Sequence, residues 1–429
     1  MAIYSTQSNT LKSNNGSLYE VVMLADQYGN PVQGGNSAGM AVDAFGRSRV
    51  SQPFTLFDSF SRYDADEKIL SSTTGGATVT YEQHSSSVLM TVSASGDQVI
   101  RETSRTFAYQ PGKSLQILNT FCLAATDSNV RQRVGYFNSE NGIFIQQVGT
   151  QTSLVLRSKS SGSVVETVVN QADWNMDKLD GSGVSGKVLD PTKSHIFFVD
   201  IEWLGVGSVR AGFVIDGQLL HCHTFHHANN IDTTYMTTAC LPCRAEITAT
   251  GATAPVSMRQ ICMSVISEGG YDLRGKPLTI NLPINAPRDM PVANTYYPIL
   301  SVRLKSAKLD GIVIPRGISL SAVGNNGYVH YRLVSGTTLT GANWVSAGAN
   351  SCIEYDMSAT AVTGGSAMSS GYTAITNQAV SQAELDGDVF KYQLERNSFT
   401  GQGTILTLQA ASNAAGNDLY ASFNLEEIT

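Results

Sequence analysis

Short runs of alternating polar and apolar residues fill the chain from residue 53 to about residue 266, and this period of two is the feature that most restricts its fold. Side chains on a β-strand point alternately to opposite faces, so such runs predict strands with one buried face. The Asp216-Gly217 pair is typical of a two-residue hairpin turn. Many short strands with frequent turns and almost no helical periodicity predict an all-β, jelly-roll sandwich. The predicted strands include residues 78–82, 87–92, 114–119, 142–148, 153–157, 195–203 and 209–219.

Turn residues and composition divide the chain into four predicted parts. Residues 1–52 have little apolar periodicity and many Gly, Ser and Asn, which predicts an N-terminal arm for attachment or assembly. Residues 53–266 form the predicted jelly-roll sandwich. The Gly- and Pro-rich segment 267–296 is interpreted as a linker, and strand-like runs resume in a smaller C-terminal β-domain, residues 297–429. We expect a short helix near residues 381–385.

The charge balance argues against nucleic acid and membrane insertion. Only 15% of the residues are charged and the net charge is −7, whereas binding to phosphates requires Lys and Arg. Basic residues occur only in short groupings, such as Arg47 with Arg49 and Arg131 with Arg133. No run approaches the ~18–20 apolar residues that span a bilayer. The beginning of the chain lacks the features of a secretory signal, so we expect synthesis in a cytoplasm, with reduced cysteines and release, if any, by a route such as lysis.

Several segments carry a resemblance that spans most of the chain from residue 43 onward. They are 43–51 (DAFGRSRVS), 54–59 (FTLFDS), 133–138 (RVGYFN) with 141–144 (NGIF), 170–181 (NQADWNMDKLDG), 200–210 (DIEWLGVGSVR), 221–229 (HCHTFHHAN), 303–305 (RLK) and 341–348 (GANWVSAG). These segments resemble tailed-bacteriophage virion structural proteins of the tail-fibre-like or head-decoration-like kind. The resemblance implies a fibre, spike or head-decoration component exposed on the particle, and it carries over no catalytic residue. The hairpin 213–217 (FVIDG) also resembles concanavalin-like and laminin-G sandwiches.

The expected partners follow from the low charge and from the resemblance. A chain with few charges does little to protect its strand edges from wrong pairing, and a symmetric neighbour would cover them. We therefore expect a homo-oligomer, with a trimer favoured because virion appendages of this kind are commonly threefold. The resemblance further implies other virion proteins as partners and a host-surface glycan as a contact. The implied location is the virion, after synthesis in the cytoplasm of a host bacterium.

One stretch has the oxygen ligands of a calcium loop at alternate positions: Asp173, Asn175, Asp177 and Asp180. However, Lys178 occupies the position where such a loop needs Gly, and Val184 the position where it needs a bidentate Glu. The alternative is a loop that is stabilised by Asx turns.

A second stretch combines His221 and His223, which would face the same side of a strand, with Cys240 and Cys243. Two imidazoles and two thiolates could form a tetrahedral zinc site, although the order of the pairs is the reverse of the common pattern. The alternative is a polar strand end that packs against a neighbouring subunit or loop. We expect no tightly bound zinc and no cofactor.

The candidate catalytic pair is Asp200 and Glu202, since jelly-roll glycosidases use paired acids on one strand. The third acid of their usual signature is missing, and an ion pair with Arg210 or Lys193 at a sheet surface is the alternative. No phosphate-binding loop, dinucleotide fingerprint or nucleophile elbow is present in the sequence. The sequence therefore predicts a structural protein that is not an enzyme. The rival interpretations are a polysaccharide-cleaving jelly-roll hydrolase and a carbohydrate-binding, lectin-like adhesin.

Overall fold

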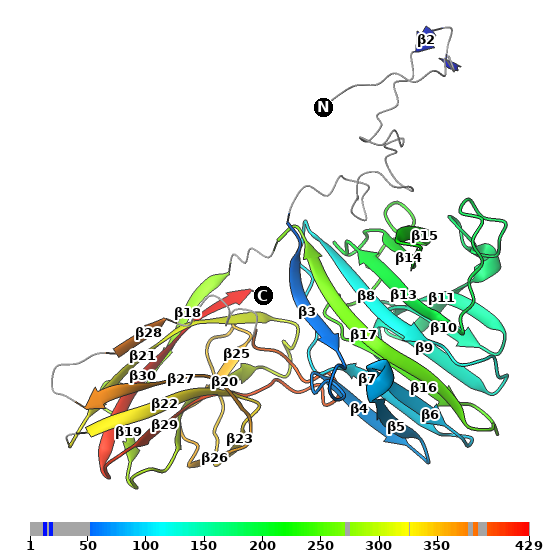
Figure 1. The fold of residues 1–429 in the computed structure, drawn as a ribbon. Helices are drawn as coiled ribbons and strands as arrows, with labels where there is room; N and C mark the ends of the chain where they lie inside the picture. The colour runs from blue at the N-terminus through cyan, green and yellow to red at the C-terminus, as the bar shows by residue number, and fades with distance from the viewer. Residues whose placement is uncertain are drawn as a thin grey trace, which may run out of the picture. The chain divides into compact units, whose positions relative to one another are not determined.

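The chain folds into two compact units that are both built from antiparallel β-strands (Figure 1). The computed structural model describes residues 12–14, 17–19, 52–270, 275–325, 327–375, 381–384 and 393–428. Unit 1 comprises Met1–Thr103 and Tyr109–Tyr271, and unit 2 comprises Ser104–Ala108 and Asp272–Thr429. The predicted all-β class with a jelly-roll sandwich is confirmed.

Unit 1 contains two large sheets in its described part. The seven-stranded sheet has the spatial order β12 (Val165–Asn170), β11 (Gln151–Ser158), β10 (Gly142–Val148), β9 (Val130–Phe137), β16 (Cys243–Ala249), β7 (Gln98–Thr103) and β4 (Ile69–Thr74). The eight-stranded sheet has the order β15 (Gln218–Phe225), β14 (Val209–Ile215), β13 (Ser194–Ile201), β8 (Ser114–Cys122), β17 (Val256–Glu268), β6 (Ser87–Val92) and β5 (Thr78–Glu82), with β3 (Phe54–Phe60) also on β17. Two 3-10 turns, η1 (Gln83–Ser85) and η2 (Gln171–Asp173), follow β5 and β12.

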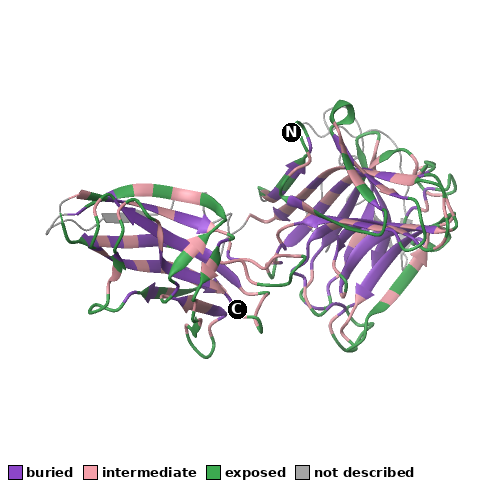
Figure 2. Ribbon diagram, turned by 90° about the horizontal axis from the view of Figure 1, so that it is seen from below, coloured by how far each residue is buried: buried purple, intermediate pink, exposed green. Residues whose placement is uncertain are grey.

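Strands that are distant in the sequence form the centre of both sheets. In the seven-stranded sheet β16 lies between β9 and β7, and in the eight-stranded sheet β17 lies between β8 and β6. Alternation explains the core: on β8, Ile117 and Phe121 are buried, whereas Leu118 and Thr120 between them are only partly buried. Figure 2 shows the same contrast between buried strands and exposed loops.

Unit 2 is a second sandwich. Its five-stranded sheet, in the residues described, has the order β18 (Lys276–Asn281), β30 (Asn417–Ile428), β21 (Ile312–Val323) and β28 (Ser381–Glu384), with β19 (Arg288–Met290) also on β30. The six-stranded sheet has the order β24 (Val345–Ser346), β25 (Ile353–Asp356), β20 (Tyr297–Leu304), β29 (Leu406–Ser412), β22 (Gly327–Ser335) and β27 (Ser366–Ile375). A small pair, β23 (Thr338–Thr340) and β26 (Ala361–Thr363), completes it. Apolar residues of both large sheets, such as Phe423 and Leu408, share one core.

Two local predictions are wrong. The segment 267–296, interpreted as a linker, contains the end of β17 and the strands β18 and β19, which pair with β30. Proline is compatible with such edge strands, because an edge leaves one row of backbone groups unpaired. The short helix expected near residues 381–385 is the strand β28, where pairing with β21 overrides local helix propensity. Most of the predicted arm, residues 1–52, lies outside the described residues, apart from β1 (Lys12–Asn14), β2 (Ser17–Tyr19) and residue 52.

Candidate functional site

The outward face of the seven-stranded sheet carries a cluster of charged, amide and aromatic side chains, here called the arginine face. On β9, Val134 and Tyr136 belong to the core, so the alternate residues Arg131, Arg133 and Phe137 point away from it. The strand register brings residues of the neighbouring strands beside them. The members of the arginine face are Arg131, Arg133, Arg157, Arg244, Glu102, Glu166, Glu246, Gln146, Phe137 and Phe144.

Glu246 on β16 is the centre of the charge network. Its carboxylate lies 2.8 Å from Arg244, 3.3 Å from Arg131 and 3.9 Å from Arg133. Arg244 also contacts Glu102 of β7 at 3.4 Å. One carboxylate therefore holds three guanidinium groups in fixed positions, and one of those groups links it to a second carboxylate.

Glu166 closes the other end of the arginine face. It accepts hydrogen bonds from Arg157 at 2.7 Å and from Arg133 at 3.2 Å. Arg133 also donates from Nε to Gln146 Oε1 at 2.7 Å. The donors and acceptors thus form a continuous chain across β12, β11, β10, β9, β16 and β7.

Two phenylalanine rings that pack against each other lie beneath the guanidinium groups. The ring centroids of Phe137 and Phe144 are 4.4 Å apart. Arg157 lies over both rings, at 5.5 and 5.0 Å, and Arg244 covers Phe137 at 5.3 Å. These cation–π contacts fix the guanidinium planes and exclude water from the rings, which are both fully buried.

Gly135 explains how the rings can meet. It pairs with Phe144 across β9 and β10, and a Cβ at this position would lie 2.3 Å from the carbonyl oxygen of Ile143. The hairpin that joins the two strands is held by Asn138, whose side chain accepts from the backbone N–H of Asn141 at 2.8 Å. The segments 133–138 and 141–144 therefore supply the β9–β10 part of this face.

The surroundings lower the pKa values of two members of the network, Glu246 and Arg133. Burial opposes ionisation of Glu246, but the adjacent Arg244, Arg133 and Arg131 outweigh it and lower the pKa of the carboxyl. Burial, with a contribution from Arg131, lowers the pKa of Arg133 to about 10. The Nε atoms of Arg131 and Arg244 have no hydrogen-bond partner among the described residues. The face therefore presents hydrogen-bonding groups that their mutual contacts hold in fixed positions.

Of the two acids singled out in the sequence, Asp200 lies on β13 of the other sheet and Glu202 follows the end of that strand; both are buried, with about 1% of each residue exposed. Asp200 of β13 lies 3.8 Å from Arg210 of β14, which is one of the two partners foreseen for it. The burial of both acids and the contact of Asp200 with Arg210 agree with the alternative, an ion pair within the sheet, for Asp200.

The calcium candidates make Asx turns. Asp177 accepts from the N–H groups of Leu179 and Ser185, and Asp180 accepts from Ser182. Asn175 instead exchanges two hydrogen bonds with the backbone of Thr224, and Asp173 is exposed. The four oxygen-bearing side chains thus serve different backbone partners, as in the loop foreseen as the alternative.

The expectation that His221 and His223 share a face is wrong. A β-bulge makes His221 pair with Gly212 and His223 with Ala211, which are adjacent residues of β14 and face opposite sides. His221 accordingly contacts the Thr224 hydroxyl at 2.8 Å, whereas His223 packs its ring on Phe225. Within the described parts of the chain, no three His, Cys, Asp or Glu side chains gather in a way that could hold a metal ion.

The arginine face was not found by sequence reasoning. The period-two pattern Arg131, Arg133, Gly135, Phe137 indicates that these residues share one face of a strand, but in the sequence Arg131 and Arg133 are only a short basic grouping. Their acidic partners, Glu166 and Glu246, are more than 30 residues away, so only the strand order reveals the network.

No family profile matches the chain, and no curated protein matches it. Solved structures with a similar fold include a β-glucanase from Bacillus licheniformis (12% identity, 50% of this chain and 98% of that chain covered, TM-score 0.32). An endo-1,3-β-glucanase from Streptomyces sioyaensis is similar at 11% identity, 51% and 97% coverage and a TM-score of 0.35. The CBM2 module of the evolved Dit of Lactobacillus casei BL23 phage J-1 is similar at 7% identity, 52% and 100% coverage and a TM-score of 0.33.

This comparison contradicts the expectation that the chain is not an enzyme, because the similar structures include several glycoside hydrolases and a transglycosylase. We do not maintain that expectation. At these identities and TM-scores the likeness concerns the fold. No helix in the described part of the chain has the length and apolar character needed to cross a membrane.

Proposed function

We propose that unit 1 is a carbohydrate-binding jelly roll and that it holds a polysaccharide against the arginine face. The observation that carries the proposal is the network itself: charged side chains on the outward face of a sheet, locked by mutual ion pairs and stacked on two phenylalanines.

Sugar recognition requires such groups. A polysaccharide presents many hydroxyls, and planar side chains with fixed donors and acceptors can recognise them. Arg131 and Glu166, whose side chains are 30% and 29% exposed, supply these groups, and their ion pairs hold them in place before a ligand binds, which lowers the entropic cost of association.

The fold alone gives no reason for the network. Removing charges from water is costly unless each is well paired, and uncharged residues on an outward sheet face avoid that cost. Four arginines and three glutamates in contact on one sheet are therefore better explained by a ligand than by stability.

The test is binding of the full chain to an array of neutral and acidic bacterial polysaccharides. We expect Arg131→Ala and Glu166→Gln, whose side chains are 30% and 29% exposed, to weaken binding at least tenfold. The matched control is Arg259→Ala on β17, also 30% exposed and also in an ion pair, which should bind normally. Binding that is unchanged in both arginine-face variants would disprove the proposal.

Cleavage of the bound polysaccharide is a second candidate, favoured by the contact of both Glu102 and Glu246 with the guanidinium of Arg244. The lowered pKa of Glu246 suits a nucleophile, which must be ionised. A general acid must keep its proton near neutral pH, and Glu102 or Glu166 would have to supply it. Release of reducing ends by the full chain, abolished in Glu246→Gln, would support cleavage; no release from any polysaccharide that binds would exclude it.

A virion is the setting we propose for this activity, because the segments that resemble tailed-phage structural proteins include the β9–β10 hairpin of the arginine face. A particle protein with a glycan-binding face would contact the host surface. Antibody labelling of purified particles in electron micrographs tests the setting, and an absence of label on intact particles would contradict it.

A further inference from the structure

The outward face of the six-stranded sheet in unit 2 carries two exposed tyrosines. Tyr328 of β22 and Tyr372 of β27 are 52% and 67% exposed, and their ring centroids lie 5.8 Å apart at 70°. On β22, Val329 and Tyr331 are buried in the core of the unit, so the alternate residues Tyr328 and His330 point the other way. Large aromatic side chains are thus presented to solvent by strands whose other face is fully packed.

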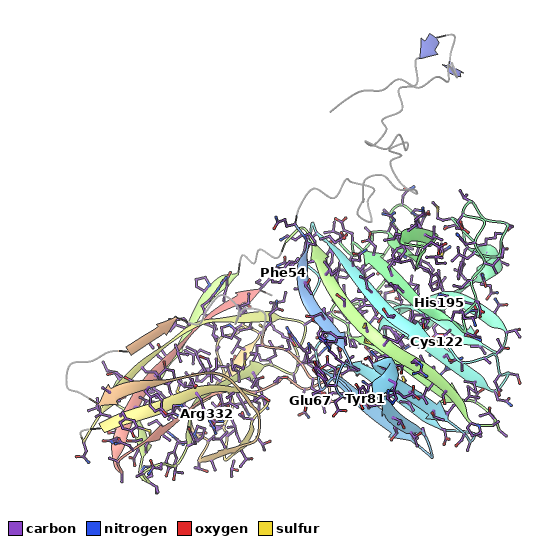
Figure 3. All side chains as sticks on the ribbon, viewed as in Figure 1. Phe54, Glu67, Tyr81, Cys122, His195 and Arg332 are labelled. Carbon is purple, nitrogen blue, oxygen red and sulfur yellow. The ribbon has the colours of Figure 1, made fainter. Side chains whose placement is uncertain are left out.

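Polar and aromatic groups extend this face, here called the tyrosine face. The ring of His330 lies 4.6 Å from that of Tyr372 and 5.8 Å from that of Tyr296, whose hydroxyl hydrogen-bonds to His330 Nδ1. Arg332, labelled in Figure 3, stacks on Tyr296 at 3.8 Å. Its Nε donates to Gln409 Oε1 of β29 at 2.8 Å.

We propose that the tyrosine face is a second carbohydrate-binding site, which stacks pyranose rings on Tyr328 and Tyr372. The C–H groups on one side of a pyranose carry partial positive charge and meet the negative face of an aromatic ring. The hydroxyls at the edge of the sugar then reach the hydroxyls of the tyrosines, Arg332 and His330. This site is separate from the arginine face and does not depend on it.

A sugar fits the size and the chemistry of the tyrosine face better than a protein partner. A stable protein complex buries about 800 Å² on each partner around an apolar centre, and two tyrosine rings with three polar neighbours supply only a small part of that. The two exposed rings are polar at their tips, and each has about the dimensions of one pyranose. The fixed Arg332–Gln409 pair adds the planar donors that vicinal hydroxyls require.

The test is affinity electrophoresis of the full chain in gels that contain soluble β-1,3-glucan, β-1,4-glucan, α-1,4-glucan or mannan. We expect one of these polysaccharides to retard the protein, and Tyr372→Ala and Tyr328→Ala each to weaken that retardation about tenfold. Tyr63→Ala is the control, because Tyr63 lies in unit 1 and is 81% exposed. The expected result for the control is retardation equal to that of the unchanged chain.

Three outcomes would overturn the inference. The first is the absence of retardation by all four polysaccharides, and the second is equal retardation of the unchanged chain and both tyrosine variants. The third is a lower mass of the tyrosine variants in light scattering, which would make the face a contact between copies of the chain. Arg131→Ala separates this site from the proposed function: it should leave retardation through the tyrosine face intact even if it abolishes binding at the arginine face.

Discussion

The arginine face of unit 1 and the tyrosine face of unit 2 are both outward faces of sheets in β-sandwiches, yet they are built in opposite ways. On the arginine face the aromatic rings are fully buried and the charges cover them. On the tyrosine face the rings are exposed, and the charged Arg332 stacks at one side. One face is a closed, self-paired network, and the other is an open platform.

The two faces differ in how much their side chains contribute to the free energy of unfolding. Every charge of the arginine face that becomes unpaired leaves a partner buried, so the network couples recognition to the stability of unit 1. The exposed rings of the tyrosine face can be removed without opening the core. Substitutions should therefore affect folding on one face and only binding on the other.

The largest effect is expected for Glu246→Ala. Removing this carboxylate leaves Arg244, Arg133 and Arg131 without their shared partner, and breaking a buried ion pair in this way costs about 3–5 kcal/mol. We expect the free energy of unfolding of unit 1 to fall by that amount in denaturant titrations. Glu140→Ala, which breaks the exposed Lys159 pair, is the control and should cost no more than about 1 kcal/mol. Equal effects of the two substitutions would show that the network is not coupled to stability.

A smaller effect should come from pH, through the neutral His221 in the other sheet of unit 1. Burial, with a contribution from the nearby Arg210, lowers its pKa from 6.5 to about 4. As the pH falls, the unfolded chain binds the proton first, so the free energy of unfolding falls between pH 6.5 and 4 and is unaffected above 6.5. The loss is up to about 3 kcal/mol, and His221→Gln should remove this part of the slope.

Denaturant titrations at several pH values measure that slope. His84→Gln, a change at an exposed histidine, is the control and should leave it unchanged. A slope that is the same in His221→Gln and in the unchanged chain would contradict the prediction.

An effect of about 1–3 kcal/mol is expected for Gly135→Ala, because the added Cβ would overlap the backbone opposite it and push Phe144 away. Gly76→Ala is the control, since a Cβ there would meet its nearest atoms at an ordinary 3.7 Å. Thermal unfolding of the two variants compares them directly. If Gly135→Ala unfolds at the same temperature as Gly76→Ala, close packing at this position does not support the arginine face.

The sequence was sufficient for the fold class because alternation is a local property, and the predicted strands 87–92, 142–148 and 209–219 coincide closely with β6, β10 and β14 to β15. The sequence was insufficient where pairing between residues that are distant in the chain determines the local structure. Pairing with β30 turned the supposed linker into strands, and a bulge at Cys222 separated two histidines that simple alternation places together. The arginine face depends on β16 lying beside β9, a neighbour that no local pattern reveals.

The smallest effect on stability is expected for Tyr372→Ala. Its side chain is 67% exposed on a face that points away from the core of unit 2, and substitutions at such positions usually change the free energy of unfolding by less than about 0.5 kcal/mol. Tyr331→Ala on the neighbouring strand is the matched contrast, because its ring is 7% exposed and belongs to the core, so its loss should cost about 3–5 kcal/mol. Denaturant titrations measure both. If Tyr372→Ala destabilises unit 2 as strongly as Tyr331→Ala, the exposed ring has a structural role, and the open platform is no different in kind from the closed network of unit 1.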